Sequence, residues 1–516
     1  MFLYSTRRPD SAKLVLPPAP TILSQLHQPP PPDRTAAGRS RPRLDPCDGE
    51  DQVAAVIGNI ERRGARVIRR IITIFATLHC LAFIDRTMIG GALPLMRVDL
   101  PMTDAGAGWL IGTAFALPYG VTALVLATIL RGRRASLWWL IGGVTIWTAA
   151  TLVTGAAQST AALMLARAGL GIGQAMFVPV AIAWLVDVAG IDGRARALSL
   201  FTSGSTIGRS TALLTIGALL SALTVITPGN SASTLGGIAH WRLLFMITAL
   251  PNIVMIPLLA GLRKKDARHR SVEPAFDDPM PDPLPSPSTT ALRAPPRAPA
   301  HAGVQWWTVA LFFAAAIMPI MLIQAMGAWL PTLFVRDRGI LPAQAAMLLG
   351  AITLFTAPAG QLAGGWLMTR YASWHGHVPA IILVSLIATL LPLAVLVWAP
   401  GLAGAAVGVA IANLTLGIAS FCGLFGVQML SPVSARITIN GIFFALVTLV
   451  GVGIGPLLTG ALATFAHSGP ATFGAGTMSP TGALGTALFT TGVIASCVCA
   501  MAVGAVRYRY RQHCAA

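Results

Sequence analysis

The chain has 516 residues, of which 55% are hydrophobic and only 10% carry a charge. An ordinary globular protein is roughly a quarter charged, so this chain has too few charged groups to cover a water-facing surface. The formal net charge of +18 would suggest nucleic-acid binding in a soluble protein. The composition excludes a soluble protein, so the positive excess must be explained by where the charges lie along the chain.

Apolar runs recur along the whole chain, and each is long enough for a helix to cross a bilayer, which takes about 20 residues. We therefore expect an all-α integral membrane protein with twelve transmembrane helices in two six-helix bundles. The predicted spans are 69–92, 105–130, 136–157, 160–187, 197–224, 241–262, 304–333, 342–368, 377–399, 401–429, 438–464 and 482–506.

Two polar segments rich in proline interrupt this pattern, and such composition cannot bury a core. The start of the chain also lacks the apolar region of a secretory signal, so the first span is expected to direct insertion. The predicted organisation is a disordered Pro/Arg-rich tail (1–66), a first bundle (67–262), a cytoplasmic linker (263–303), a second bundle (304–506) and a basic C-terminal tail (507–516).

The basic residues favour one orientation in the membrane, because cytoplasmic loops are enriched in lysine and arginine. With both termini inside, 22 basic residues fall on the inner side, and only Arg97, Arg242, Arg336 and Arg338 fall outside. Both termini are therefore expected to be cytoplasmic. Arginine outnumbers lysine 33 to 3, which suggests a GC-rich bacterial genome and hence a multi-pass protein of the bacterial inner membrane.

Acidic residues are scarce in the spans, and Asp85 is the one that lies deep in an apolar run. A charge near the bilayer centre costs roughly 2.5–3.5 kcal/mol on insertion scales, so Asp85 should face a partner or a watery cavity. Asp187 falls at the inner end of the fourth span. The others, Asp99, Asp104, Asp192 and Asp337, fall in predicted loops.

Intramembrane charges generally mark ion or substrate pathways, which favours a coupling role for Asp85 and its neighbour Arg86. A buried ion pair that fixes helix packing is the alternative. Arg167 and Arg209 are the other intramembrane charges of the first bundle, and we expect them to line or stabilise a substrate cavity. Packing arginines bonded to carbonyl groups remain the competing interpretation for both.

The 6 + 6 layout with a long central loop resembles the major facilitator superfamily. Several strings are similar to its spinster-like branch, more clearly over 67–262 than over 304–506. They are Ile84-Asp85-Arg86, Asp99-Leu100-Pro101-Met102-Thr103-Asp104, Gly112-Thr-Ala-Phe115-Ala-Leu-Pro-Tyr119, Arg167-x-Gly169-x-Gly171-x-Gly173, Trp241-Arg242 and Gly451-x-Gly453-x-Gly455-Pro456.

The resemblance implies a gating motif of the type Gly-x-Leu-x-Asp-Arg after helices 2 and 8, whose acid latches the inner gate. Here the acid is replaced in both halves, which puts that latch in doubt, although Arg134 and Asp187 can still pair. The corresponding positions are Ala127, Arg131 and Arg134 in the first half and Gly365, Thr369 and Arg370 in the second, with Gly451, Gly455 and Pro456 in helix 11.

Spinster-like proteins carry a glutamate after the glycines of helix 4, whereas this chain has Gln174, which can bind a ligand but cannot carry a proton. Gln174 lies two turns from Arg167 on the same helix face. The second half offers neutral groups to the cavity, each of which could equally bond a neighbouring helix. They are Gln324, Asn413, Gln428 and Asn440.

These features predict a secondary active transporter of a small organic solute, anionic or amphipathic, that works by alternating access with protons as the coupling ion. A facilitative uniporter, a drug or metabolite efflux protein and a non-transporting sensor remain alternatives. The sequence has no zinc-protease, Walker or Ser-His-Asp pattern, so no enzyme, metal or cofactor is expected. The expected partners are the substrate, protons and the lipid bilayer, without nucleic acid, and we expect a monomer.

Overall fold

A computed structural model describes the backbone of residues 46–129, 136–226, 234–270, 306–371, 377–431, 436–468 and 480–515. The chain divides into two units, Met1–Arg63 and Gly64–Ala516. The first unit contributes only the first turns of one helix to the described backbone, and side chains are described from Arg66 onward. The second unit carries all the spans and sites.

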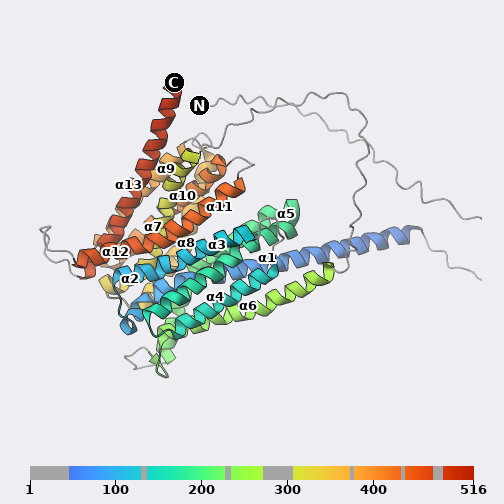
Figure 1. Cartoon of the computed structure of the whole chain (residues 1–516), viewed down its shortest axis with the longest axis horizontal. Coiled ribbons are helices and arrows are strands. Elements are labelled where there is room, and N and C mark those ends of the chain that lie inside the picture. The colour runs from blue at the N-terminus through green and yellow to red at the C-terminus, as the bar shows by residue number, and fades with distance from the viewer. Residues whose placement is uncertain are drawn as a thin grey trace, which may run out of the picture. The chain divides into compact units, whose positions relative to one another are not determined.

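The described chain is helical except for one short hairpin (Figure 1). The first half contains α1 (Pro46–Asp99), α2 (Asp104–Gly108), η2 (Trp109–Thr113), α3 (Ala114–Ile129), α4 (Leu137–Ala156), α5 (Thr160–Ile226), β1 (Thr234–Leu235), β2 (Ile238–Ala239) and α6 (His240–Arg270). The second half contains α7 (Trp306–Arg338), α8 (Pro342–Arg370), α9 (Val378–Trp398), α10 (Gly401–Leu430), α11 (Arg436–Leu446), η4 (Val447–Ile454), α12 (Gly455–Ser468) and α13 (Pro480–Ala515).

Twelve helical stretches in the described residues are long and apolar enough to cross a membrane, as the sequence predicts. Helix α5 holds the fourth and fifth spans, while α2–η2–α3 and α11–η4–α12 form the second and eleventh. All four predicted loop acids belong to helices instead, because these helices extend beyond the apolar runs. Asp99 ends α1, Asp104 begins α2, and Asp337 lies in the last turn of α7. Asp192 falls within α5, which continues as helix between the fourth and fifth spans.

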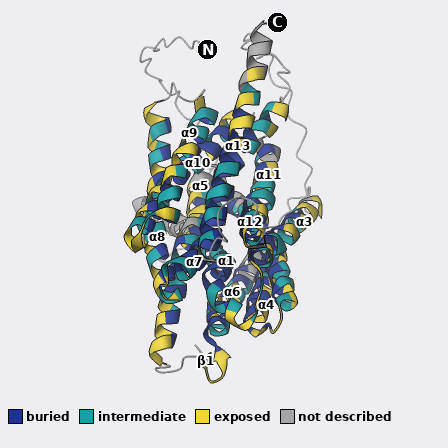
Figure 2. Cartoon of the chain, turned by 90° about the vertical axis from the view of Figure 1, so that its left-hand side faces the viewer, coloured by how far each residue is buried: buried dark blue, intermediate teal, exposed yellow. Residues whose placement is uncertain are grey.

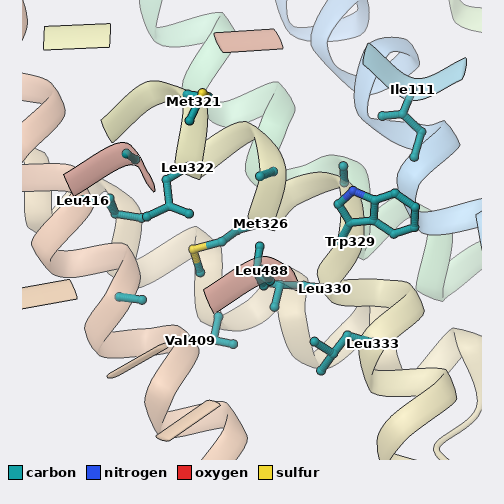
Figure 3. Close-up of a cluster of buried hydrophobic side chains, with 14 of the residues drawn as sticks. Ile111, Met321, Leu322, Met326, Trp329, Leu330, Leu333, Val409, Leu416 and Leu488 are labelled. Carbon is teal, nitrogen blue, oxygen red and sulfur yellow. The ribbon is translucent and has the colours of Figure 1, made fainter. Parts of the chain in front are cut away.

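The buried side chains form two clusters. Figure 2 marks the buried positions in dark blue along the ribbon. One belongs almost entirely to the first six spans and centres on the aromatic rings of Phe75, Trp147 and Phe177. The larger cluster joins both halves, with Trp329 of α7 near Ile111 of η2 (Figure 3). The two halves therefore share a continuous apolar core along α7.

One end of the second unit carries the β1–β2 hairpin, and we call it the hairpin end. Gly236 and Gly237 make its turn with φ angles of 59° and 80°, a conformation that residues other than glycine rarely adopt. All four arginines predicted to lie outside are bonded near this end. Arg97 and Arg336 contact Asp104, Arg242 donates to the carbonyl oxygen of Ala157, and Arg338 donates to the carbonyl oxygens of Leu396, Val397 and Ala399.

Two π-helical stretches face each other between the halves, η2 and η4. The Thr113 hydroxyl donates to the carbonyl oxygen of Gly453 over 3.1 Å. A Cβ atom on Gly112 would lie 2.6 Å from that same oxygen, so only glycine permits this approach. The second and eleventh spans thus pack backbone to backbone where η2 meets η4.

Candidate substrate and coupling site

A cavity of about 60 Å³ lies between the two halves. The first half lines it mainly with charged and aromatic side chains, and the second half with small or apolar ones. The lining residues from the first half include Phe83, Arg86, Thr87, Arg167 and Arg209, and those from the second include Ile323, Gln324, Gly327, Ala328, Val452 and Pro456.

Arg86 of α1 projects into an aromatic cage. Its guanidinium lies 4.4 Å from the ring centre of Phe115, 4.6 Å from that of Phe83 and 5.4 Å from that of Tyr119. Its Nη2 and Nε donate to Oε1 of Gln174 over 3.0 and 3.2 Å. The Gln174 amide in turn donates to the carbonyl oxygen of Ala82 over 2.8 Å, so this glutamine orients the arginine rather than reaching the cavity itself.

Arg167 of α5 is only 2% exposed and binds backbone carbonyl groups. Its Nη2 donates to the carbonyl oxygens of Ile111 and Arg86, over 3.0 and 3.4 Å, and its Nε donates to that of Leu110 over 3.4 Å. It therefore ties the first, second and fourth spans together. These bonds agree with the interpretation of Arg167 as a packing arginine. Its position on the cavity wall agrees with the other interpretation, that Arg167 lines a substrate cavity.

Arg209, also on α5, differs from the other two. Within the described residues its guanidinium has no hydrogen-bonded or ion-paired partner, and it lies 5.4 Å from the ring centre of Phe83. An arginine on a cavity wall keeps its charge. Arg209 is therefore free to bind an anionic group of a ligand.

Asp85 lies behind the cavity wall, is 3% exposed and accepts a hydrogen bond of 2.6 Å from Nδ2 of Asn252 on α6. Sequence reasoning found Asp85 by its isolation but missed Asn252. A single amide in an apolar run has no characteristic spacing, and only the approach of α6 to α1 pairs the two residues across 167 positions.

The predicted polar residues of the second half divide into two groups. Gln324 lines the cavity. Asn413 and Asn440 are not among the lining residues; the Asn413 amide donates to the hydroxyls of Thr356 and Thr353 over 3.2 and 3.4 Å. Asn440 accepts from the Gln428 amide over 2.9 Å. The structure thus gives these two asparagines contacts to neighbouring helices.

The predicted gating residues are only partly visible. Arg131 and Arg134 lie outside the described residues, as do the side chains of Ala127 and Asp187. Thr369 and Arg370 are exposed at the end of α8, with Gly365 one turn earlier beside Phe421. In the eleventh span a Cβ on Gly455 would lie 2.6 Å from the Met321 carbonyl oxygen, Gly451 faces Ile320, and the Pro456 carbonyl oxygen accepts from Nε1 of Trp329 over 2.9 Å.

Asp104 forms an ion-paired contact between the halves at the hairpin end. Its carboxylate is paired with Arg97 of the first half and accepts from both terminal nitrogens of Arg336 of the second, over 2.9 and 3.0 Å. The backbone N–H of Ala105 also donates to the Thr464 hydroxyl across the same boundary, over 2.9 Å. We call the group Arg97, Asp104 and Arg336 the hairpin-end latch.

The site thus joins a cationic cavity and a buried carboxylate between two sets of six spans, the arrangement of a membrane transporter. The model of the Major Facilitator Superfamily matches residues 75–456. The chain therefore belongs to the major facilitator superfamily, a family of multi-pass membrane transporters and not of enzymes.

Individual relatives are more distant. The cephamycin export protein CmcT of Amycolatopsis lactamdurans is 31% identical over 37% of this chain and 36% of its own length. The spinster homolog 1 protein of Homo sapiens is 24% identical over 52% of this chain and 46% of its own length. The chain therefore matches about a third to a half of the length of these relatives.

A solved structure shares the fold over nearly its whole length. It is a bacterial homologue of the human lysosomal transporter Spinster in an inward-facing and occupied conformation, with a TM-score of 0.64 and 22% identity. The match covers 86% of this chain and 97% of that one. The resemblance predicted from the sequence, to the superfamily and its spinster-like branch, is confirmed.

Proposed function

We propose that the protein is a secondary active transporter of a small organic anion, coupled to protons at Asp85. The observation that carries the proposal is the charge around one cavity: the guanidinium groups of Arg86, Arg167 and Arg209 line it, and the carboxylate of Asp85 is buried behind its wall. Such an excess of positive charge inside a membrane is stabilised when a negatively charged ligand enters. The inner membrane of a bacterium, with both termini cytoplasmic and a monomeric chain, is part of this proposal.

The uncharged part of the wall points to the rest of the ligand. Phe83, Ile323 and Val452 line the cavity beside the arginines, so an apolar or aromatic group can pack there while the anionic group binds Arg209. An amphipathic organic anion matches both surfaces. Gln324 adds a neutral amide from the opposite half, which can donate to or accept from the ligand.

Alternating access follows from the size of the cavity and from its walls. A space of about 60 Å³ cannot hold an aromatic ring, because a cavity that binds benzene has about 150 Å³. The two halves must therefore separate to admit a ligand. The halves approach closely beside the cavity, since a Cβ on Gly90 of α1 would lie 3.2 Å from Ala328 of α7. The hairpin-end latch holds the halves together beyond it.

Uptake into proteoliposomes tests the proposal, with benzenesulfonate as the probe because it stays ionised and does not cross lipid as a neutral acid. We expect uptake driven by a pH gradient, and a loss of that gradient dependence in Asp85→Asn. Arg69→Gln, at an exposed position of α1, is the matched control and should transport like the unmodified protein. Phenyltrimethylammonium, a cation of similar size, should not be taken up.

Equal uptake of the cation and the anion would contradict the anionic class. The anionic class would also be contradicted if liposomes with the protein took up no more of each anion than empty liposomes do. The anions to test are benzenesulfonate, phenyl phosphate and octyl sulfate. Benzenesulfonate uptake that responds neither to the pH gradient nor to Asp85→Asn would remove the coupling and leave facilitative uniport.

Gln174 favours uniport as the second candidate, since both ends of its neutral amide are already bonded. Export as the direction is supported by the similarity to CmcT, a cephamycin export protein.

A further inference from the structure

Asn252 of α6 is the direct partner of Asp85, and it is buried with 0% of its surface exposed. Its Nδ2 donates to Oδ2 of Asp85, while its own Oδ1 is buried and has no hydrogen-bond partner among the described residues. A buried carbonyl oxygen without a donor is unfavourable, so it requires an explanation. The amide is half satisfied while Asp85 is ionised.

The two protonation states of a carboxyl group need different partners. An ionised carboxylate only accepts hydrogen bonds, whereas a protonated carboxyl also donates one through its O–H. A side-chain amide carries its donor and its acceptor in one plane, on opposite sides of the Cβ–Cγ bond. A half-turn of the Asn252 amide would therefore bring Oδ1 to the place of Nδ2 and allow it to accept from a protonated Asp85.

The other groups around Asp85 cannot do this. Arg86 on the same helix and Arg167 and Arg209 on α5 donate but have no acceptor, so they stabilise only the ionised form. Other titratable groups described on these helices are engaged elsewhere: His79 of α1 bonds the carbonyl oxygen of Phe201, the Cys80 thiol bonds Thr211, and the Tyr119 ring of α3 lies against Arg86. Helix α6 presents Asn252 to the carboxyl and carries its own charges at its ends, and α7 contributes the neutral Gln324 to the cavity.

We propose that Asn252 accompanies Asp85 through its protonation cycle, donating to the carboxylate and, after a half-turn of its amide, accepting from the carboxyl. It is a positioning residue that keeps the buried acid hydrogen-bonded in both states. The inference rests on the proposed function, because it requires Asp85 to bind and release a proton. It adds α6 to the coupling machinery, so a proton on α1 changes a contact between two helices.

Infrared difference spectroscopy of the full chain in lipid nanodiscs tests this without a transport ligand. A change of pH should produce the C=O stretch of one protonated carboxyl, and Asp85→Asn should abolish it. In Asn252→Leu, which has nearly the same shape, we expect that band to move to higher wavenumber because the O–H loses its acceptor. In Asn252→Ser the hydroxyl can both donate and accept, so we expect a smaller shift.

Thr248→Val is the matched control, one turn earlier on α6. The Thr248 side chain is buried as well, but its hydroxyl bonds only within its own helix among the described contacts, to the carbonyl oxygens of Leu244 and Phe245. It should leave the band unchanged. A band at the same wavenumber in the unmodified protein, Asn252→Leu and Asn252→Ser would overturn the role of Asn252 and leave proton coupling intact.

The absence of any Asp85-dependent band, across the pH range in which the protein stays folded, would instead overturn both this inference and proton coupling. Size-exclusion chromatography checks that each variant is folded. If Asn252→Leu does not fold, the comparison of Asn252→Ser with Thr248→Val decides, and equal bands in these two variants would overturn the proposal.

Discussion

The two halves of the molecule differ in where they place charge. The first six spans hold Asp85, Arg86, Arg167 and Arg209 within the membrane, and side-chain amides or backbone carbonyls from several of its helices bind three of them. The second half lines the same cavity with small and apolar groups and one amide, Gln324. In the function that we propose, ligand recognition and proton binding are therefore concentrated in the first half, and the second half is the wall that moves.

The hairpin-end latch is an exception to this difference in charge, because Arg336 of the second half forms an ion pair with Asp104 of the first. Its position at the end of the helices suits a contact that must form and separate as the halves move. Contacts of the first half around Arg167, by comparison, should persist in every state.

The strongest test of the contrast removes Arg167. We expect Arg167→Leu to destabilise the protein by about 3–5 kcal/mol, because it leaves the three buried carbonyl groups that Arg167 binds without their charged donor. Unfolding in detergent, followed by tryptophan fluorescence, measures the change. Arg69→Leu at an exposed position should stay within about 0.5 kcal/mol of the unmodified protein. Equal effects of the two changes would show that Arg167 does not hold the first half together.

An intermediate effect is expected at the hairpin-end latch. Asp104→Asn removes the charge that Arg97 and Arg336 share, and the loss of about 1 kcal/mol would raise the population open at this end about fivefold. In a cysteine-free background, Thr87→Cys in the cavity should then react faster with a membrane-impermeant thiol reagent. No change in the reaction rate would mean that the packing of the halves, and not the latch, closes this end.

The smallest effect is expected in the second half. Asn413→Ala should change stability by about 1 kcal/mol or less, since it removes two hydrogen bonds to Thr353 and Thr356 that are both longer than 3.1 Å. Benzenesulfonate uptake should be unchanged, because Asn413 does not line the cavity. A loss of uptake with a normal yield of folded protein would show that the second half also recognises the ligand.

Sequence alone predicts the twelve spans because the length and polarity of each run are local properties. It also isolates Asp85, since a deep carboxylate is conspicuous when acids are scarce, and it places Arg86, Arg167 and Arg209 near it. It does not reveal Asn252, whose role depends on the approach of two helices. The sequence predicts Asp104 in a loop for the same reason. Its burial depends on a contact with Arg336, which lies 232 positions away in the sequence.

The π-helical stretches have no hydropathy signal either, since they change the winding of a helix and not its composition. Such stretches are frequent at functional sites in helices. Here η2 and η4 lie against each other, and their glycines allow the contact. The sequence shows the glycines but not the change in winding.

That change in winding sets the rotational register of the eleventh span. Each residue of an α-helix turns the chain by about 100°, so every extra residue in a wide turn re-aims all side chains that follow it. Deleting one residue from Val447–Ile454 would leave the span apolar and long enough to cross the membrane. It would nevertheless rotate Pro456 away from Trp329 and Thr464 away from Ala105, so the eleventh span tolerates substitution far better than a change in length.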